Sequence, residues 1–309
     1  MELTKKISIL VPVYKSEQTL ESLMQRINDT LFPVYKNEYE VIFIEDCGGG
    51  KSWNIIEHLK STYPNNIIGI KLSRNFGQHN ALMCGLNYAS GDIIITIDDD
   101  LQIPPEEIIN LIKKHNETNA DLVYGTFGDK KHNQVRNLGS WVIKRVFKIV
   151  FNAKPDATAF RLITKSLAKK LIEHKQNHVF LDGFIHWHTQ NIQYQNVEHK
   201  TRQFGSSTYT VKKLLSLTFN LFFNFTVIPL RVITFLGIVF SIISFLIGLY
   251  MIYVKIYYGV PVQGYTSLAT IILFTSSMMM MSMGIVGEYI SRIFMSLNNK
   301  PQYSIEKKI

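Results

Sequence analysis

Three consecutive carboxylates, Asp98, Asp99 and Asp100, follow the apolar run 93–97. Like charges at contact distance repel one another, and the cost rises when they leave water. Either a solvated surface turn or a divalent cation can offset that repulsion. Residues i and i+2 of an extended segment point the same way, so Asp98 and Asp100 can share one cation while Asp99 points elsewhere. Such oxygens suit Mg²⁺ or Mn²⁺, which can stabilise a departing nucleoside diphosphate.

The elements that must position this triplet are alternating strands and helices. Four segments rich in β-branched residues predict strands, at 7–13, 40–44, 67–72 and 92–97. Three helical segments separate them, at 19–30, 52–61 and 79–89. This alternation predicts an α/β fold with a parallel sheet covered on both faces, and ligands of such sheets bind beyond the carboxyl ends of the strands.

Candidate site residues, most of them polar, lie at the ends of all four predicted strands. They are Pro12, Tyr14 and Glu17 at the end of the first, Glu45, Asp46 and the glycines 48–50 after the second, Ser73 to Gly77 after the third, and the triplet after the fourth. These groups are therefore expected to converge on one edge of the sheet. The glycine run matches neither phosphate-loop pattern, so a plain flexible turn is an equal interpretation.

The composition changes sharply near residue 226. Two overwhelmingly apolar stretches, 232–253 and 268–290, are each long enough to cross a bilayer, which needs about 20 helical residues. Helices of a soluble core usually show a polar face, and these stretches do not. We therefore expect a cytoplasmic domain over 1–225 and a membrane anchor over 226–309 with two transmembrane helices and a short cytoplasmic tail.

Basic residues indicate the orientation of the anchor. They flank both spans on the outer sides of the hairpin, at Lys212, Lys213, Arg231, Arg292, Lys300, Lys307 and Lys308, whereas the loop 255–265 holds one lysine. By the positive-inside tendency, the domain over 1–225 and both termini face the cytoplasm. Gly284 and Gly287 are small residues that let helices approach, which is consistent with a homo-oligomer.

The net charge of +9 favours an anionic partner, which can be nucleic acid, a phosphorylated substrate or a membrane surface. A nucleic-acid binder would explain the charge but neither the carboxylate edge nor the spans, so no nucleic-acid partner is expected. Two cysteines, Cys47 and Cys84, form no disulfide framework and no zinc spacing, and the first residues lack the apolar core of a signal peptide.

Two basic amphipathic segments, 135–151 and 209–225, predict helices that lie at the membrane interface and meet anionic headgroups. For the first of them, a helix packed on the sheet with its lysines in water is an equally good interpretation. An interfacial position would bring the predicted site to the bilayer surface.

The runs Ile9–Tyr14, Leu72–Gly77 and Asp98–Glu106 resemble family 2 glycosyltransferases with the GT-A fold. Phe160–Leu162, the pattern at 202–209 and the two closing spans extend the resemblance to the membrane-anchored polyprenyl-phosphate branch, which includes dolichyl-phosphate mannose synthase and bacterial undecaprenyl-phosphate enzymes. The resemblance implies roles for individual residues. Pro12, Tyr14, Glu17 and Asp46 would hold the base and ribose, Asp98, Asp100 and Gln102 the metal and diphosphate, Asp99 the nucleotide-sugar, and Arg202 and Ser207 a loop over the donor.

Several positions depart from the family pattern. Glu45-Asp46-Cys47-Gly48 stands where Asp-Asp-Gly-Ser is usual, Thr126-Phe127 replaces an arginine step, Thr158-Ala159 replaces Gly-Asp, and His199 with Arg202 replaces paired arginines. Each change touches the donor or acceptor pocket, so the identity of the sugar does not carry over from the better-known members.

The absence of an acid at Ala159 bears on the acceptor. A hydroxyl acceptor needs a general base, whereas a lipid phosphate, whose second pKa is about 6, is already largely a nucleophilic anion. Asp156 and Asp182 are candidate catalytic bases, although Asp182 can equally be a loop cap.

The expected function is inverting, metal-dependent transfer of a sugar from a nucleotide-diphosphate sugar to a polyprenyl (undecaprenyl) phosphate at the cytoplasmic face of the cell membrane, for envelope glycans. One alternative is transfer to a hydroxyl of a lipid-linked saccharide. Another is a catalytically weakened membrane scaffold of the same fold, which the intact Asp98, Asp100 and Gln102 disfavour.

Overall fold

The computed structural model describes residues 5–127, 157–176, 179–200, 228–258, 264–298 and 300–309. The chain divides into two compact units, one of residues 1–209 with 299–309 and one of residues 210–298. The boundary predicted at 225/226 and the two predicted interfacial segments, 135–151 and 209–225, lie outside the described residues.

The first unit is built on an eight-stranded mixed sheet with the order β7-β5-β6-β4-β1-β2-β3-β8. The strands are β1 (Ile7–Val13), β2 (Tyr39–Glu45), β3 (Ile67–Leu72), β4 (Ile93–Thr96), β5 (Leu122–Thr126), β6 (Ala157–Thr164), β7 (Ile192–Asn196) and β8 (Ile305–Lys308). The four strands expected from the sequence are all present. Their parallel pairing is confirmed, because β1 pairs with β2 and β4, and β2 pairs with β3, all in parallel.

Antiparallel strands extend this parallel core on both sides. β6 runs antiparallel to β4 and β5, and β8 runs antiparallel to β3. The sheet is therefore mixed, and the carboxyl ends of β4, β1, β2 and β3 still meet at one edge, as expected for the site.

The helices of the first unit are α1 (Leu20–Tyr35), α2 (Ser52–Thr62), α3 (Gln78–Tyr88), α4 (Ile108–Thr118), α6 (Lys165–Ile172) and α7 (Leu181–His188), with a 3-10 turn η1 (Pro105–Glu107). α1 extends past the predicted end at residue 30 and through Pro33. A proline in the last turn removes one helical bond, and Lys36 N–H still closes the helix on Phe32 O at 3.0 Å.

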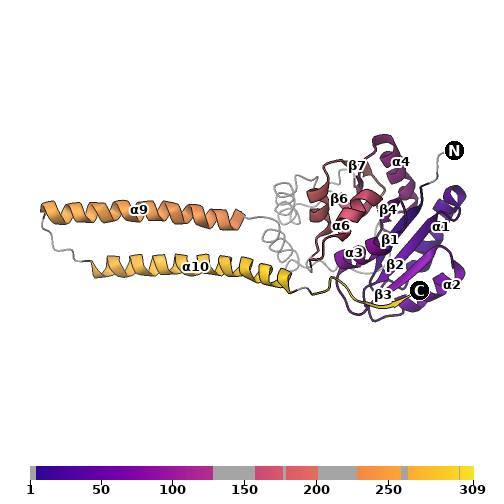
Figure 1. Cartoon of the computed structure of the whole chain (residues 1–309), viewed down its shortest axis with the longest axis horizontal. Coiled ribbons are helices and arrows are strands. Elements are labelled where there is room, and N and C mark those ends of the chain that lie inside the picture. The colour runs from indigo at the N-terminus through magenta and orange to yellow at the C-terminus, as the bar shows by residue number, and fades with distance from the viewer. Residues whose placement is uncertain (1–4, 128–156, 177–178, 201–227, 259–263, 299) are drawn as a thin grey trace. The chain divides into compact units, whose positions relative to one another are not determined.

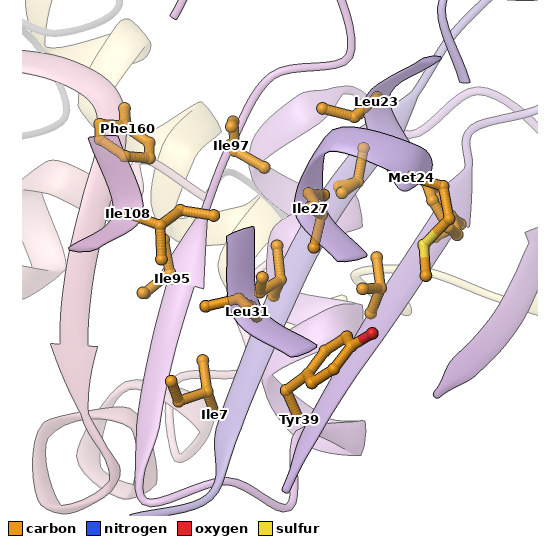
Figure 2. Packing of buried hydrophobic residues seen from close by; sticks show 14 of the residues in the cluster. Ile7, Leu23, Met24, Ile27, Leu31, Tyr39, Ile95, Ile97, Ile108 and Phe160 are labelled. Atoms are coloured by element: carbon orange, nitrogen blue, oxygen red, sulfur yellow. The ribbon is translucent and has the colours of Figure 1, made fainter. Parts of the chain in front are cut away.

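Helices cover both faces of the sheet (Figure 1). On one face, Leu23, Ile27 and Leu31 recur at the helical spacing of four along α1 and point at the strands (Figure 2). On the other face α3 approaches closely at Gly85, where a Cβ atom would lie 2.9 Å from the Ile44 side chain. The tight packing on both faces fixes the edge from which the candidate site residues project.

The second unit contains two long helices, α9 (Ile228–Tyr258) and α10 (Tyr265–Leu297). The first predicted span lies within α9, whose segment Leu230–Tyr258 has a mean hydropathy of 2.6 and is unburied. Among the described residues, α9 is the one helix long and apolar enough to cross a membrane. The second predicted span falls within α10, and its membrane crossing is not confirmed by this criterion.

Candidate active site

The carboxylate triplet follows β4, and its first two side chains bind two different neighbouring segments. Asp98 Oδ1 accepts a hydrogen bond from Gln78 Nε2 at 2.7 Å, and Gln78 is the first residue of α3. Asp99 Oδ2 instead accepts the backbone N–H of Tyr14 at 3.2 Å and the hydroxyl of Ser16, in the loop after β1. The two neighbouring carboxylates thus bind different elements. The backbone forms a turn at Asp99 and Asp100, so the extended conformation from which Asp98 and Asp100 were expected to point the same way does not continue through the triplet.

The third carboxylate shapes its own turn. Asp100 Oδ1 accepts the backbone N–H of Gln102 at 3.1 Å, across Leu101, whose φ is +58°. Lys15 after β1 and Cys47 after β2 also have positive φ values, of 57° and 51°. Left-handed backbone in residues other than glycine stores strain and tends to gather at functional sites. Here it gathers at the carboxyl edge of the sheet.

Burial makes Asp98 and Asp99 costly to ionise. Desolvation, reinforced by Asp100 and Asp99, raises the pKa of Asp98 to about 6, while Arg161 partly opposes the rise. Desolvation also raises the pKa of Asp99 to about 6, against the opposing hydrogen bonds of Ser16 and Tyr14. A site that holds several carboxylates at an energetic cost is chemically suited to a hard divalent cation.

The ligand set supplied by the protein is small. In the part of the chain that the structure describes, no three Asp, Glu, His or Cys side chains converge as a group that could hold a metal. Mg²⁺ commonly takes one or two protein carboxylates and completes its shell with water and substrate phosphates. Asp98 and Asp100 therefore fit a cation that is bound together with a diphosphate, and they do not fit a closed structural metal site.

Asp46, expected at the nucleotide, holds the loop between β3 and α3. Its two carboxylate oxygens accept the backbone N–H groups of Phe76 and Gly77 at 2.7 and 2.8 Å. Burial raises the pKa of Asp46 against these two hydrogen bonds. Neighbouring Glu45 is also buried, and its Oε2 has no hydrogen-bond partner among the described residues, whereas its Oε1 accepts Gly48 N–H at 2.6 Å.

The other expected nucleotide residues lie on the same edge. Pro12 is in β1 opposite Ile44, and the side chain of Tyr14 is 49% exposed beside Asp99. Glu17 accepts the backbone N–H of Lys51 at 2.6 Å, which joins the loops after β1 and β2. A Cβ atom at Gly50 would overlap the Glu17 carboxylate, so the glycine allows this approach.

The remaining expected site residues are divided between described and undescribed parts of the chain. The backbone carbonyl of Gln102 accepts Lys200 N–H at 2.8 Å. Asp156, Arg202 and Ser207 lie outside the described residues, and so does the loop that was expected over the donor.

A buried ion pair lies beside the triplet. Of its two residues, Asp182 was expected in the site as a candidate base, whereas Arg161 was given no role there. Arg161 of β6 is 1% exposed and forms an ion pair with Asp182 of α7. The hydroxyl of Tyr124 in β5 donates to Asp182 Oδ1 at 2.7 Å, and the Arg161 guanidinium lies 5.7 Å from the Tyr124 ring centre. Tyr124, Arg161 and Asp182 thus form a cluster to which β5, β6 and α7 each contribute one side chain.

The cluster sets the protonation of its own acid and affects the triplet. Burial raises the pKa of Asp182, but Arg161, followed by His79 and the Tyr124 hydroxyl, outweighs burial and lowers it overall. Asp182 is thus ionised and engaged with partners, which makes it a weak candidate for proton removal. The signal that could have found Arg161 is its position in an apolar run, because a buried guanidinium requires a partner.

Models of two known families match the chain. The model of glycosyl transferase family 2 matches residues 8–184, and the model of the GtrB C-terminal hairpin matches residues 228–293.

Relatives match over nearly the full length. The SfII prophage-derived bactoprenol glucosyl transferase of Shigella flexneri is 33% identical, over 98% of this chain and 98% of its own. The undecaprenyl-phosphate 4-deoxy-4-formamido-L-arabinose transferase of Shewanella sediminis is 32% identical, over 97% and 91%. A crystal structure of glucosyl-3-phosphoglycerate synthase from Mycobacterium tuberculosis, in complex with Mn²⁺, uridine diphosphate and glucosyl-3-phosphoglycerate, shares the fold with a TM-score of 0.51, at 14% identity over 71% and 78% of the two chains. This chain therefore belongs to glycosyl transferase family 2 and is a glycosyltransferase with a GT-A-like fold.

Proposed function

We propose that this glycosyltransferase moves a sugar from a nucleotide-diphosphate sugar to a polyprenyl phosphate, with inversion at the anomeric carbon, at the cytoplasmic face of the membrane. The observation that carries the proposal is the carboxylate triplet at the carboxyl edge of the sheet, with pKa values of Asp98 and Asp99 raised to about 6. The bactoprenol and undecaprenyl-phosphate names of the relatives support the same class of acceptor.

The residues of the site divide the work of binding the donor. Asp98 and Asp100 hold Mg²⁺ or Mn²⁺, which supplies charge neutralisation for the departing diphosphate when bound. Glu17 and Asp46 brace the loops after β1, β2 and β3 that border the nucleotide. Gln78 holds Asp98 in place, and this keeps the carboxylate oriented before the donor arrives.

The state of Asp182 favours a phosphate over a hydroxyl acceptor. A hydroxyl must lose its proton to a base during attack, and Asp182 is ion-paired with Arg161 and has a lowered pKa. A phosphate monoester needs no such base at neutral pH. Its oxygen attacks the anomeric carbon, the bond to the diphosphate breaks with its electron pair, and a single displacement of this kind inverts the configuration.

The test is transfer by the purified full-length chain in detergent. Undecaprenyl phosphate is supplied with Mg²⁺ or Mn²⁺ and a panel of nucleotide-sugars, and the lipid product is followed by thin-layer chromatography. The proposal predicts transfer to the bare lipid phosphate from at least one donor. Folded protein that uses only a lipid-linked saccharide, or no donor at all, would contradict it.

A further inference from the structure

The last ten residues of the chain return from the hairpin to the first unit. Residues 300–309 belong to that unit, and β8 adds an antiparallel strand along the outer edge of β3 (Figure 1). β8 ends at Lys308, directly before the final residue Ile309. The edge of β3 is thus covered by a segment that the chain reaches only after both long helices.

Backbone hydrogen bonds hold the strand at both of its ends. Ile309 N–H donates to Gly69 O at 2.9 Å, and Gly69 N–H donates to Ile309 O at 3.1 Å. At the other end Ser73 N–H donates to Ser304 O at 2.9 Å. The segment from Ser304 to Ile309 is therefore paired with β3 from Gly69 to Ser73, the residue that follows the strand, with a shift of register between Lys71 and Leu72.

The missing side chain of Gly69 leaves a notch in β3, and the side chain of Ile309 lies in this notch. A Cβ atom at Gly69 would lie 2.8 Å from both the Ile309 and the Ile56 side chains, so only glycine lets Ile309 reach α2 at this place. Ile309 packs against the hydrophobic core as a partly buried residue. Burial of this apolar side chain stabilises the pairing, so Ile309 is the apolar anchor of the strand.

Ion pairs add to the fit at the surface. Glu306 pairs with Lys71 of β3 at 2.7 Å, and Lys307 pairs with Glu57 of α2 at 2.6 Å. Exposed ion pairs contribute little free energy on their own. These two pairs therefore fix the register of β8 on β3 more than they strengthen its binding there. Upstream of β8, the side-chain amide of Gln302 donates to two backbone carbonyls after α6, at 2.6 and 2.9 Å.

The strand touches the loop that borders the candidate donor site. Ser73, held by Ser304, is the first residue after β3, and the next residues include Phe76 and Gly77, whose N–H groups bind Asp46. Gln78, which follows them, holds Asp98. The loop is therefore fixed at one end by the C-terminal tail and at the other by two acids of the site.

We propose that the C-terminal strand is a positioning element for the donor site, acting through β3 and the loop 73–77. This inference rests on the proposed function, because it assigns that loop to donor binding. It makes the final residue of the membrane-anchored chain part of the support of the nucleotide pocket.

The first test is Ile309→Asp, which places a charge in the notch at Gly69, with Ile309→Val as the matched control. Loss of the strand removes the support of the loop 73–77 at Ser73, so nucleotide binding is expected to weaken roughly tenfold, which corresponds to about 1.4 kcal/mol. Binding of UDP and GDP with Mn²⁺ is measured by calorimetry on the full-length protein. The KM for nucleotide-sugar should rise by a similar factor while kcat changes less, which a general loss of folded enzyme would not produce.

The second test is rescue by a covalent link. Lys71 and Lys307 are direct partners across β3 and β8, so Lys71→Cys with Lys307→Cys can form a disulfide there in the Ile309→Asp background. Oxidation should restore nucleotide affinity, and reduction should remove it again. The link also shows on a non-reducing gel whether β8 pairs within its own chain, as the inference requires, or with a second copy.

The outcomes separate the inference from the proposed function. Equal nucleotide affinity of the wild type and Ile309→Asp would overturn the inference alone, and so would a formed disulfide without rescue. Wild-type protein that binds neither UDP nor GDP would overturn the proposed function and this inference with it.

Discussion

At the scale of single residues, Asp98 carries opposite consequences for stability and for activity. Desolvation, with Asp100 and Asp99, raises its pKa to about 6 from an ordinary value of 3.8. A carboxyl whose pKa is higher in the folded than in the unfolded state stabilises the fold below the unfolded value, and this contribution is lost as the pH rises through about 6. At neutral pH the ionised Asp98 therefore lowers the stability of the metal-free protein, although the proposed metal site requires this carboxylate in its ionised form.

We predict that Asp98→Asn stabilises the metal-free protein at pH 7.5, by on the order of 1–3 kcal/mol, because the neutral amide avoids the cost of ionisation. The difference from the wild type should narrow as the pH falls below about 6, where wild-type Asp98 is itself protonated. Thermal melting in EDTA across this pH range measures it. A variant that is less stable than the wild type at pH 7.5 would contradict the assignment of strain to Asp98.

The Arg161–Asp182 pair supports a second prediction. Arg161 opposes the rise in the pKa of Asp98, so Arg161→Met should raise that pKa and move the acid limb of the pH–activity profile to higher pH. The same variant leaves Asp182 buried without its partner, which should lower the free energy of unfolding by about 3–5 kcal/mol. The pH–rate profile and urea denaturation measure the two effects.

The matched variant is Asp182→Asn, which frees Arg161 of its counter-charge. Stability should again fall, but the acid limb should now move to lower pH, because the guanidinium acts on Asp98 without compensation. Shifts in the same direction for both variants would rule out an electrostatic link between this pair and Asp98.

The residues of the site differ in how far the sequence predicts them. The triplet is local, so its place after an apolar run predicts that it lies at the carboxyl edge of the sheet, but the sequence does not predict the turn at Asp99 and Asp100. Arg161 was included in the family resemblance but given no role in the site. Its place in an apolar run signals a buried partner, and the sequence does not show that this partner is Asp182 of another element. The role of Asp46 at the nucleotide stays a prediction. Its hydrogen bonds to the backbone of Phe76 and Gly77 were not predicted, because that loop is distant in sequence.

At the scale of elements, the loop between β3 and α3 depends on Asp46. Asp46→Ala leaves the N–H groups of Phe76 and Gly77 without acceptors, which should cost about 1–3 kcal/mol per group where they stay buried. Because the loop borders the donor site, the KM for nucleotide-sugar should rise as well. Urea denaturation and steady-state kinetics measure the two changes.

Asp46→Asn is the matched control for this prediction, because the amide keeps one acceptor oxygen. Its loss of stability and its rise in KM should be smaller than those of the alanine variant. An alanine variant with wild-type KM would show that the loop does not contribute to donor binding.

The elements themselves were predicted where their signals are local. The parallel core β1 to β4 and the helices α1 to α3 follow from alternating apolar periods. β5, β6, β7 and β8 were not predicted. β8 is a short, charged segment that pairs with β3 across more than two hundred residues, so its own sequence does not mark it as a strand. Such pairing is decided by tertiary contacts rather than by local propensity.

At the scale of the whole molecule, the predicted topology places two spans between cytoplasmic ends. Gly264 lies between α9 and α10. We predict that the cysteine introduced by Gly264→Cys reacts with a membrane-impermeant maleimide on intact cells. Lys300→Cys and the native Cys47 should react only after lysis, and Cys47 serves as the internal control. Protection of position 264 on intact cells, with reaction after lysis, would contradict the two-span topology.

The sequence predicts the anchor from composition alone, because a bilayer demands long apolar helices. It does not predict that the tail after the second helix pairs with β3, since the four residues of β8 give no periodic signal of their own. The resemblance to glycosyltransferases is confirmed by the family models over both the catalytic and the hairpin segments.

The most direct measurement of the central claim is sugar transfer to undecaprenyl phosphate by wild-type protein, Asp98→Asn and Asp100→Asn, each with EDTA and with added Mg²⁺ or Mn²⁺. The account predicts that EDTA abolishes wild-type transfer, that metal restores it, and that each variant loses roughly 100-fold or more in kcat at saturating metal. Transfer and metal dependence unchanged in either variant would contradict the claim that these two carboxylates hold the cation.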